Sequence, residues 1–194
     1  MHKIAFSGIP GSGKTSILNE VKKILSLKSR IEDVPDLRLS SRFDFDQKPG
    51  FISQFFFLSN QINEENIRLL SQPDYLLCDC SILDHWLKWQ KFLAEKKSGS
   101  QIEEKNNLLK SLYYFWITTY TVIFRIRVNS KELEKRLPAS GLHAHDIDQC
   151  QQMDALYGQI ILADQIHAID IWNQKSIDES AQEVLKKISE LKLL

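Results

Sequence analysis

One short segment near the N-terminus constrains the fold of this chain more than any other feature. Residues 8–15 read Gly-Ile-Pro-Gly-Ser-Gly-Lys-Thr, which matches the pattern Gly-x-x-x-x-Gly-Lys-Ser/Thr. An apolar, strand-like run precedes the segment at residues 3–7, and a helix-periodic run follows it at residues 14–27. A glycine-rich turn between a strand and a helix presents backbone amides and a helix N-terminus to an anion. The sequence therefore predicts a phosphate-binding loop.

The positions of this loop have different expected roles. The glycines let a phosphate approach the main-chain N–H groups closely. Lys14 is expected to reach the β and γ phosphates and to act in catalysis, and the Thr15 hydroxyl is expected to ligate Mg²⁺. The residues expected to contact a nucleotide are Gly8, Ile9, Pro10, Gly11, Ser12, Gly13, Lys14, Thr15 and Ser16.

Asp79 is the expected second metal ligand and a candidate catalytic residue. It ends a second apolar run, residues 75–79, in the position of a Walker B aspartate. A carboxylate there binds Mg²⁺ directly or through water, or accepts a proton from a substrate hydroxyl. The alternative is a strand-end aspartate that caps the following helix.

Strand-like and helix-like segments alternate along the whole chain. The expected strands lie at residues 3–7, within 30–46, and at 75–79, 121–128 and 167–172. Helical spacing separates them, although residues 138–150 look irregular, and a Ser-x-x-Glu capping box at residue 176 opens a last helix. This order predicts an α/β chain with a mostly parallel five-stranded sheet and helices on both faces, the three-layer P-loop NTPase fold. Residues 1–194 are expected to form one domain, with ligands at the carboxyl ends of the strands.

Composition narrows the expected partners and location. The 25 lysines and arginines balance the 25 aspartates and glutamates, so no net charge favours nucleic acid or a membrane surface. We expect neither as a partner. The chain has three cysteines and no apolar run long enough to cross a bilayer, which favours a reducing cytoplasm.

Two other branches of phosphate-loop proteins fit the sequence poorly. GTPases need a guanine-reading Asn-Lys-x-Asp, but residues 129–132 read Asn-Ser-Lys-Glu. They also carry Asp-x-x-Gly where this chain has Asp-Cys-Ser-Ile from Asp79. Oligomeric ATPases place a glutamate after the strand-end aspartate, where Cys80 stands here. A small-molecule kinase that uses ATP remains.

Further segments resemble a known group of small kinases. Residues 79–84, Asp-Cys-Ser-Ile-Leu-Asp, resemble the Asp-Arg-Ser-x-x-Asp element of thymidylate-kinase-like and deoxynucleoside-kinase-like proteins and of the kinase domain of nicotinamide riboside kinases. The spacing of Gln54, Gln61 and Glu64 is similar to the glutamine-bearing helix before that element. Residues 32–35, Glu-Asp-Val-Pro, resemble the acidic segment after the second strand. With the loop, the likeness runs from residue 3 to residue 89.

The resemblance implies a complete set of functional parts. ATP is the implied phosphoryl donor, Mg²⁺ the cofactor, and a small molecule with a nucleoside-like hydroxyl or a monophosphate the acceptor. Glu32 or Asp33 is the implied base, with the choice between them open. The residues expected at the acceptor are Arg42, Phe43, Gln54, Gln61 and Asp84. Similar kinases are often dimers, so a homodimer is a further expectation, with Trp86, Trp89 and Trp116 in either the core or the interface.

Two departures from the family pattern concern positive charge. Cys80 replaces the arginine that follows the strand-end aspartate, and the segment expected to form the lid, about residues 136–152, holds one arginine, Arg136. An arginine beside the transferred phosphoryl group contributes about 10³-fold or more to the rate. Arg136, Arg125, Arg127, Arg38 or Arg42 could supply the missing charge, and Arg136 is the candidate catalytic residue among them. The alternative is a catalytically weakened nucleotide-binding regulatory module or a slow NTPase.

Overall fold

Five parallel strands form the centre of the molecule. The computed structural model describes residues 1–37, 50–95, 100–140 and 146–193. The sheet has the order β2-β3-β1-β4-β5, and all of its strand pairs are parallel. Its strands are β1 (His2–Ser7), β2 (Ile31–Val34), β3 (Tyr75–Asp79), β4 (Val122–Arg127) and β5 (Ala168–Trp172). This confirms the expected five-stranded parallel sheet.

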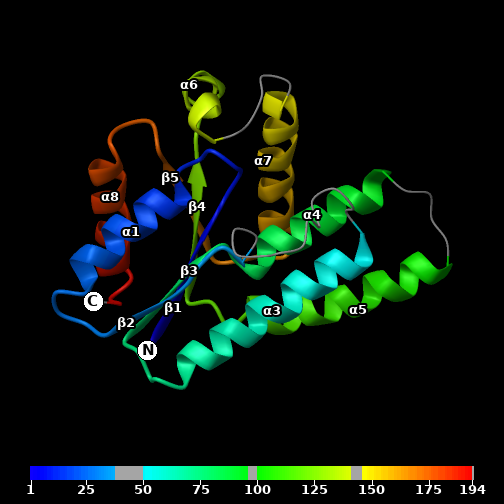
Figure 1. Cartoon of the computed structure of the whole chain (residues 1–194), viewed down its shortest axis with the longest axis horizontal. Coiled ribbons are helices and arrows are strands. Elements are labelled where there is room, and N and C mark those ends of the chain that lie inside the picture. The colour runs from blue at the N-terminus through cyan, green and yellow to red at the C-terminus, as the bar shows by residue number, and fades with distance from the viewer. Residues whose placement is uncertain (38–49, 96–99, 141–145, 194) are drawn as a thin grey trace.

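Helices cover both faces of the sheet, so the three-layer prediction is also confirmed (Figure 1). One face carries α1 (Lys14–Leu25) and α8 (Ile177–Glu190), which lie side by side. The opposite face carries α3 (Phe51–Leu69), α4 (Ile82–Glu95), α5 (Ser100–Ile117) and α7 (Asp146–Ala163), and α6 (Ser130–Ser140) follows the carboxyl end of β4. Within the described ranges, none of these helices combines the length and the apolar character that a bilayer crossing requires.

The core beneath α1 and α8 follows from helical and strand periodicity. Ile17, Leu18 and Val21 recur on one face of α1 and are buried. They pack with alternate residues of β1 and β4, including Phe6 and Phe124. Burial on both faces explains why the inner strands β1, β3 and β4 read as largely apolar runs, whereas the outer strands β2 and β5 are less buried.

The core beneath the other helices contains the tryptophans. Trp86, Trp89 and Trp116 are 5%, 1% and 7% exposed and belong to one buried cluster with Tyr113. Trp86 stacks on Tyr113 with ring centroids 4.8 Å apart. Of the two predicted locations for these tryptophans, the core or a dimer interface, the structure shows the core.

The least accurate part of the sequence prediction is the stretch between β4 and β5. Residues 138–150 were expected to be irregular, but α6 continues to Ser140 and α7 already begins at Asp146. The signal for α7 was present, because Ile147, Cys150, Met153 and Tyr157 recur at intervals of three or four residues and pack inward. The expected lid spans these two helix ends and residues 141–145, which lie outside the described residues.

Candidate functional site

The predicted phosphate loop lies at the carboxyl edge of the sheet, between β1 and α1. Gly8 has φ +146°, and a Cβ at that position would collide with the carbonyl oxygen of Ile126 on β4. Gly13 has φ +92°, and a Cβ there would collide with the side-chain amide of Asn173, just after β5. Both positions need glycine because of these close approaches. The loop is therefore held tightly against the ends of β4 and β5.

Lys14 points into the loop that precedes it. Its ammonium group donates to the carbonyl oxygens of Gly8 at 2.9 Å and Ile9 at 3.2 Å, and the residue is 7% exposed. The amide of Ser12 also donates to the Ile9 carbonyl, at 3.2 Å, which closes the turn. The loop thus carries a buried cation at its centre, as a site for a polyphosphate requires.

Thr15 and Asp79 form the second part of the site. The Thr15 hydroxyl donates to Asp79 Oδ2 at 2.6 Å, while Asp79 Oδ1 is buried with no hydrogen-bond partner in the structure as described. Burial raises the pKa of Asp79 above the ordinary aspartate value, and Thr15 and Lys14 partly oppose that shift. A hydroxyl and a carboxylate are hard oxygen ligands. This donor set, with one buried oxygen lacking a donor, fits Mg²⁺.

Asp84 lies beneath the loop instead of facing an acceptor. Its Oδ2 accepts hydrogen bonds from the Ser7 hydroxyl at 2.7 Å and from the Ser81 amide and hydroxyl at 2.8 and 3.1 Å. Its Oδ1 accepts from the Tyr157 hydroxyl at 2.6 Å and the Gly8 amide at 3.4 Å. The side chain is 4% exposed, and both oxygens are occupied by protein donors. The substrate-binding prediction for Asp84 is therefore replaced by a supporting role under the loop.

The acidic residues of β2 also lie elsewhere than expected. Glu32 pairs with Arg68 at 3.6 Å, and Asp33 pairs with Lys22 at 2.5 Å. The reason is register: Glu32 and Asp33 stand opposite Leu76 and Leu77, two or more residues short of the strand end at Asp79.

The acidic residue at the carboxyl edge of β2 is Asp36. It is 7% exposed, it accepts a hydrogen bond from the Cys80 thiol at 3.4 Å, and its charge contributes to the raised pKa of Asp79. Cys80 itself is 1% exposed and has φ +96°, an unfavourable backbone angle for a non-glycine residue. Asp36 thus lies beside Cys80 and close to Asp79, in the position predicted for Glu32 or Asp33.

Arg136 is the arginine that the structure brings to the loop. From α6, its guanidinium donates to the carbonyl oxygens of Ser12 at 3.3 Å and Asn173 at 2.9 Å. Arg125 and Arg127 instead bond carboxylates: Arg125 bonds Asp170 at 2.7 Å, and Arg127 bonds Asp154 at 2.6 Å and Asp170 at 3.0 Å. Arg42 and Phe43, expected at the acceptor, lie outside the described residues.

The two glutamines predicted at the acceptor both lie on the buried face of α3. Gln61 is fully buried, and its amide nitrogen donates to Glu65 at 2.7 Å and to the carbonyl of Cys80 at 3.5 Å. Gln54 is 4% exposed. The side-chain oxygens of both residues are buried without a hydrogen-bond partner in the described structure. Gln61 therefore sits behind the strand end of β3, and Gln54 lies two helical turns away.

Besides Asp36, two residues of the site escaped the sequence analysis. Asn173 is fully buried and its amide donates to the Ser12 carbonyl at 2.7 Å, while its oxygen accepts from Ser180 at 3.2 Å. Its position just after the last apolar strand was a usable signal, because ligand sites form at the carboxyl ends of parallel strands. Tyr157 reaches the Gly8 carbonyl at 3.4 Å from α7, and only its helical periodicity was visible in the sequence.

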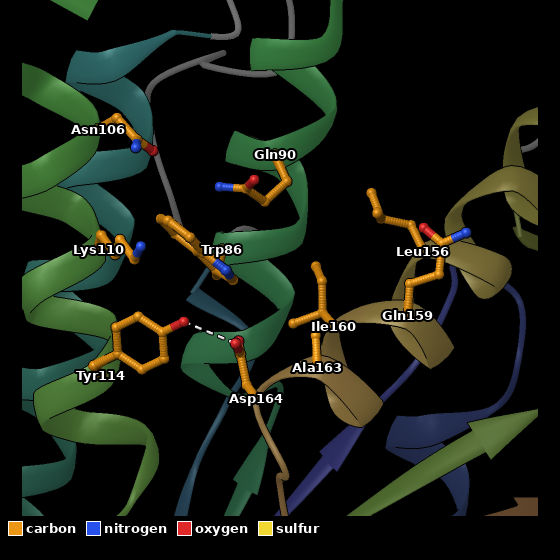
Figure 2. Close-up of a pocket in the computed structure, with 10 residues that line it drawn as sticks. All are labelled: Trp86, Gln90, Asn106, Lys110, Tyr114, Leu156, Gln159, Ile160, Ala163 and Asp164. Atoms are coloured by element: carbon orange, nitrogen blue, oxygen red, sulfur yellow. Dashed lines mark hydrogen bonds between the residues drawn. The ribbon is translucent and has the colours of Figure 1, made fainter. Parts of the chain in front are cut away.

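A separate hollow of about 310 Å³ lies between α4, α5 and α7. Figure 2 shows its lining, with Trp86 between the helices and the Tyr114 hydroxyl bonded to Asp164 at 2.7 Å. Its lining shares no residue with the phosphate loop or with the Thr15–Asp79 pair. The hollow is thus not part of the site described above.

Comparison with known proteins rests on structure. No protein-family model matches the sequence, and no curated protein matches it. The fold is similar to deoxyadenosine kinase from M. mycoides with bound dATP, with a TM-score of 0.72 at 15% identity over 97% of this chain and 100% of that chain. Structures of that kinase with the products dCMP and a flexible dCDP, and with dCTP, have TM-scores of 0.66 at 16% and 15% identity, over 97% of this chain and 99% of those chains. The expected likeness to P-loop deoxynucleoside kinases is confirmed for the fold.

Proposed function

We propose that this chain is an ATP-dependent kinase that transfers the γ-phosphoryl group to a nucleoside-like acceptor, with a deoxynucleoside as the first candidate. The observation that carries the proposal is the Lys14 ammonium inside the loop next to the Thr15–Asp79 pair. The fold shared with a kinase of deoxynucleosides over nearly the whole chain supports the acceptor class. Sequence identity of 15% leaves the particular base open.

The donor site uses the loop and the metal pair. The loop amides and Lys14 would hold the β and γ phosphates of ATP. Thr15 and Asp79 would hold Mg²⁺, which neutralises charge on the phosphates when bound. The Lys14 ammonium uses two of its three N–H donors on the Gly8 and Ile9 carbonyls, so one donor remains for a phosphate oxygen.

Phosphoryl transfer depends mainly on positioning and on charge around the transferred group. Arg136 supplies a guanidinium at the Ser12 and Asn173 carbonyls, which supports the catalytic role expected from the sequence. Asp36 is the proposed acceptor of the substrate hydroxyl proton in place of Glu32 or Asp33, because it lies at the same strand edge as Asp79. Gln54 and Gln61 remain the proposed readers of a base edge, since the buried amide oxygen of each has no hydrogen-bond partner among the described residues.

The remaining proposals concern the setting of the reaction. We place the protein in the cytoplasm, as one domain with a lid near residues 136–152, without a nucleic-acid or membrane partner. Balanced charge and three buried cysteine thiols support this setting. Homodimer formation stays an expectation from the resemblance.

The test of this function is acceptor-dependent ADP formation from ATP and Mg²⁺. The wild-type protein is assayed with a panel of deoxynucleosides, nucleosides and monophosphates, and without an acceptor. The proposal predicts ADP formation that depends on at least one acceptor and is lost in Lys14→Ala. ADP formation with no acceptor dependence across the panel contradicts it.

The role of Asp36 is tested by matched substitutions. Asp36→Asn is expected to lower kcat by about 10²-fold or more, the usual contribution of a general base. Glu32→Gln and Asp33→Asn, whose carboxylates bond Arg68 and Lys22 away from the loop, are expected to retain kcat within about twofold. A loss in Glu32→Gln together with an unaffected Asp36→Asn would restore the original sequence prediction.

A second candidate is a nucleotide-binding module with weak catalysis. The observation that favours it is that Cys80 replaces an arginine and that Arg125 and Arg127 are bonded to Asp170 and Asp154. It predicts tight binding of ATP, with acceptor-dependent turnover near background. The same assay, with ATP affinity measured in parallel, separates the two candidates.

A further inference from the structure

The hollow between α4, α5 and α7 has a buried floor and an exposed mouth (Figure 2). Trp86 and Ile160 are 5% and 8% exposed and form the floor, whereas Lys110 and Gln159 at the mouth are exposed. The volume of about 310 Å³ lies at the lower end of the range for small-molecule sites. Since the lining shares no residue with the phosphate loop, the chemistry of a ligand here has to follow from the three walls themselves.

The α5 wall presents hydrogen-bond donors. Asn106 and Lys110 are four residues apart, so they lie on the same face of the helix. Asn106 Oδ1 accepts from the Trp89 indole at 3.0 Å, which leaves the NH2 group of the amide without an acceptor among the described residues. Lys110 Nζ lies 5.7 Å from the centre of the Tyr114 ring and forms no ion pair within the part of the chain that the structure describes. This wall therefore offers an amide and an ammonium group to an acceptor.

The α4 wall adds an indole donor. Trp86 stacks on Tyr113 through its ring, and no residue in the described ranges accepts from its N–H group. A buried indole N–H usually has a hydrogen-bond partner. Gln90, one helical turn further along α4, lines the same wall with a side-chain amide. The hollow thus has donors from two helices above an apolar floor.

The α7 wall is apolar. Leu156, Ile160 and Ala163 follow one another at intervals of four and three residues, which places them on one face of the helix, toward the hollow. Because these side chains carry no hydrogen-bonding groups, they suit the apolar part of a ligand. A fitting ligand is therefore amphipathic, with its polar group toward α5 and its apolar part toward α7.

Asp164 determines where a charged group of the ligand can lie. Its two oxygens accept from the Tyr113 hydroxyl at 3.0 Å and from the Tyr114 hydroxyl at 2.7 Å. Figure 2 shows this carboxylate at the opposite end of the hollow from Asn106. An anion beside Asp164 would be repelled, whereas an anion beside Asn106 and Lys110 meets a positive charge and N–H donors. The α5 wall is therefore the place for a negative charge.

We propose that this hollow is a second binding site, which takes a small organic anion with a carboxylate or phosphate group on an apolar body. The anionic group accepts hydrogen bonds from Lys110 and from the NH2 group of Asn106. The apolar body packs against Trp86, Leu156 and Ile160. The site goes beyond the proposed kinase reaction and does not depend on it, because the two sites share no residue.

The first measurement is a titration of the whole chain, followed by the indole N–H signals in ¹H–¹⁵N NMR spectra. The chain has four tryptophans, and the signal that is missing in Trp86→Phe belongs to Trp86. Phenylacetate and phenyl phosphate are the probes, and benzyl alcohol is the neutral control. We expect the anions to shift the Trp86 signal saturably with a Kd of about 1 mM or lower, and benzyl alcohol to bind at least about tenfold more weakly. A response to only one of the two anions assigns the site to that anionic group.

The second measurement repeats the titration with substitutions on α5. Lys110→Met removes the charge and is expected to raise Kd by about tenfold. Asn106→Asp keeps an acceptor for Trp89 but replaces the NH2 group by a negative charge, so saturable binding should be lost. Lys105→Met is the matched control, because it removes the same charge from the same helix at a lysine that lies 5.6 Å from the Phe51 ring and outside the lining of the hollow. Its Kd should stay within about twofold of the wild-type value.

Three results would overturn the inference. The first is a Trp86 signal that neither anion shifts, and the second is an equal affinity for benzyl alcohol. The third is a Kd that stays unchanged in both Lys110→Met and Asn106→Asp. Each result is separate from the kinase assay, because neither probe is a nucleotide.

Discussion

The ionised form of Asp79 has opposite effects on stability and on the proposed function. Its carboxyl group lies at the carboxyl end of a buried strand, and burial raises its pKa. A folded-state pKa above the unfolded value means that the folded protein binds the proton more tightly. The free energy of unfolding therefore falls as pH rises through the folded-state pKa. The ionised form that would hold Mg²⁺ is thus the form that destabilises the empty protein.

This linkage gives a pH prediction. As pH falls, Mg²⁺-dependent nucleotide affinity is expected to be lost at a pH above the ordinary titration range of an aspartate, while the metal-free protein gains stability over the same interval. Asp79→Asn should remove the part of the pH dependence of both quantities that comes from this carboxyl group. Calorimetric affinities and urea unfolding measured between pH 4 and 7 check it. Opposite trends in the two quantities are required, and parallel trends would exclude Asp79 as their source.

At the scale of elements, one buried carboxylate joins three segments that are distant in sequence. Asp84 at the start of α4 accepts from Ser7 at the end of β1, from Gly8 in the loop and from Tyr157 on α7. The position of the loop depends on these bonds, on the Asn173 amide and on Ile9, which is buried in the core cluster. Asp84 is therefore the residue through which helices on one face support the phosphate loop.

Removal of that carboxylate should be costly. Asp84→Ala leaves several buried donors without an acceptor, so the free energy of unfolding is expected to fall by about 3 kcal/mol or more. Asp164→Ala is the control, since that partly exposed carboxylate accepts, among the described residues, from the hydroxyls of Tyr113 and Tyr114, and a loss of about 1 kcal/mol is expected. Equal losses in urea titrations would show that Asp84 has no special place in the fold.

At the scale of the whole molecule, local sequence patterns predicted the helices, the strands and the phosphate loop. Contacts between segments distant in sequence determined the positions of several site residues. The loop, the strand ending at Asp79 and the capping box at Ser176 depend on neighbours in sequence, and they were predicted correctly. The position of Asp36 depends on the register of β2 against β3, and that of Tyr157 depends on the packing of α7. Neither relation has a local sequence pattern.

A buried ion pair connects β1 to the helix layer that contains α3 and α5. Lys3 on β1 is 2% exposed and bonds Glu65 on α3 at 2.5 Å, with its ammonium group over the ring of Trp116 at 4.1 Å. Trp116 and Tyr120 also donate to Glu65, each at 2.6 Å. The pair is enclosed by groups from α3, from α5 and from the turn that precedes β4.

Breaking this pair should destabilise the whole protein. Lys3→Met leaves the Glu65 charge buried without its counter-ion, so a loss of about 3–5 kcal/mol in the free energy of unfolding is expected. Lys22→Met, which breaks the half-exposed pair with Asp33, should cost no more than about 1 kcal/mol. Denaturant unfolding compares the two. Similar small losses would indicate that water reaches the Lys3–Glu65 pair.

The most direct measurement is the affinity of Lys14→Ala for ATP with Mg²⁺. The wild-type protein should bind ATP, and the variant should lose tight binding while its Tm stays close to the wild-type value. Lys23→Ala on the exposed face of the same helix should bind as the wild type does. An ATP affinity that is unchanged in Lys14→Ala would contradict the assignment of residues 8–15 as the phosphate site.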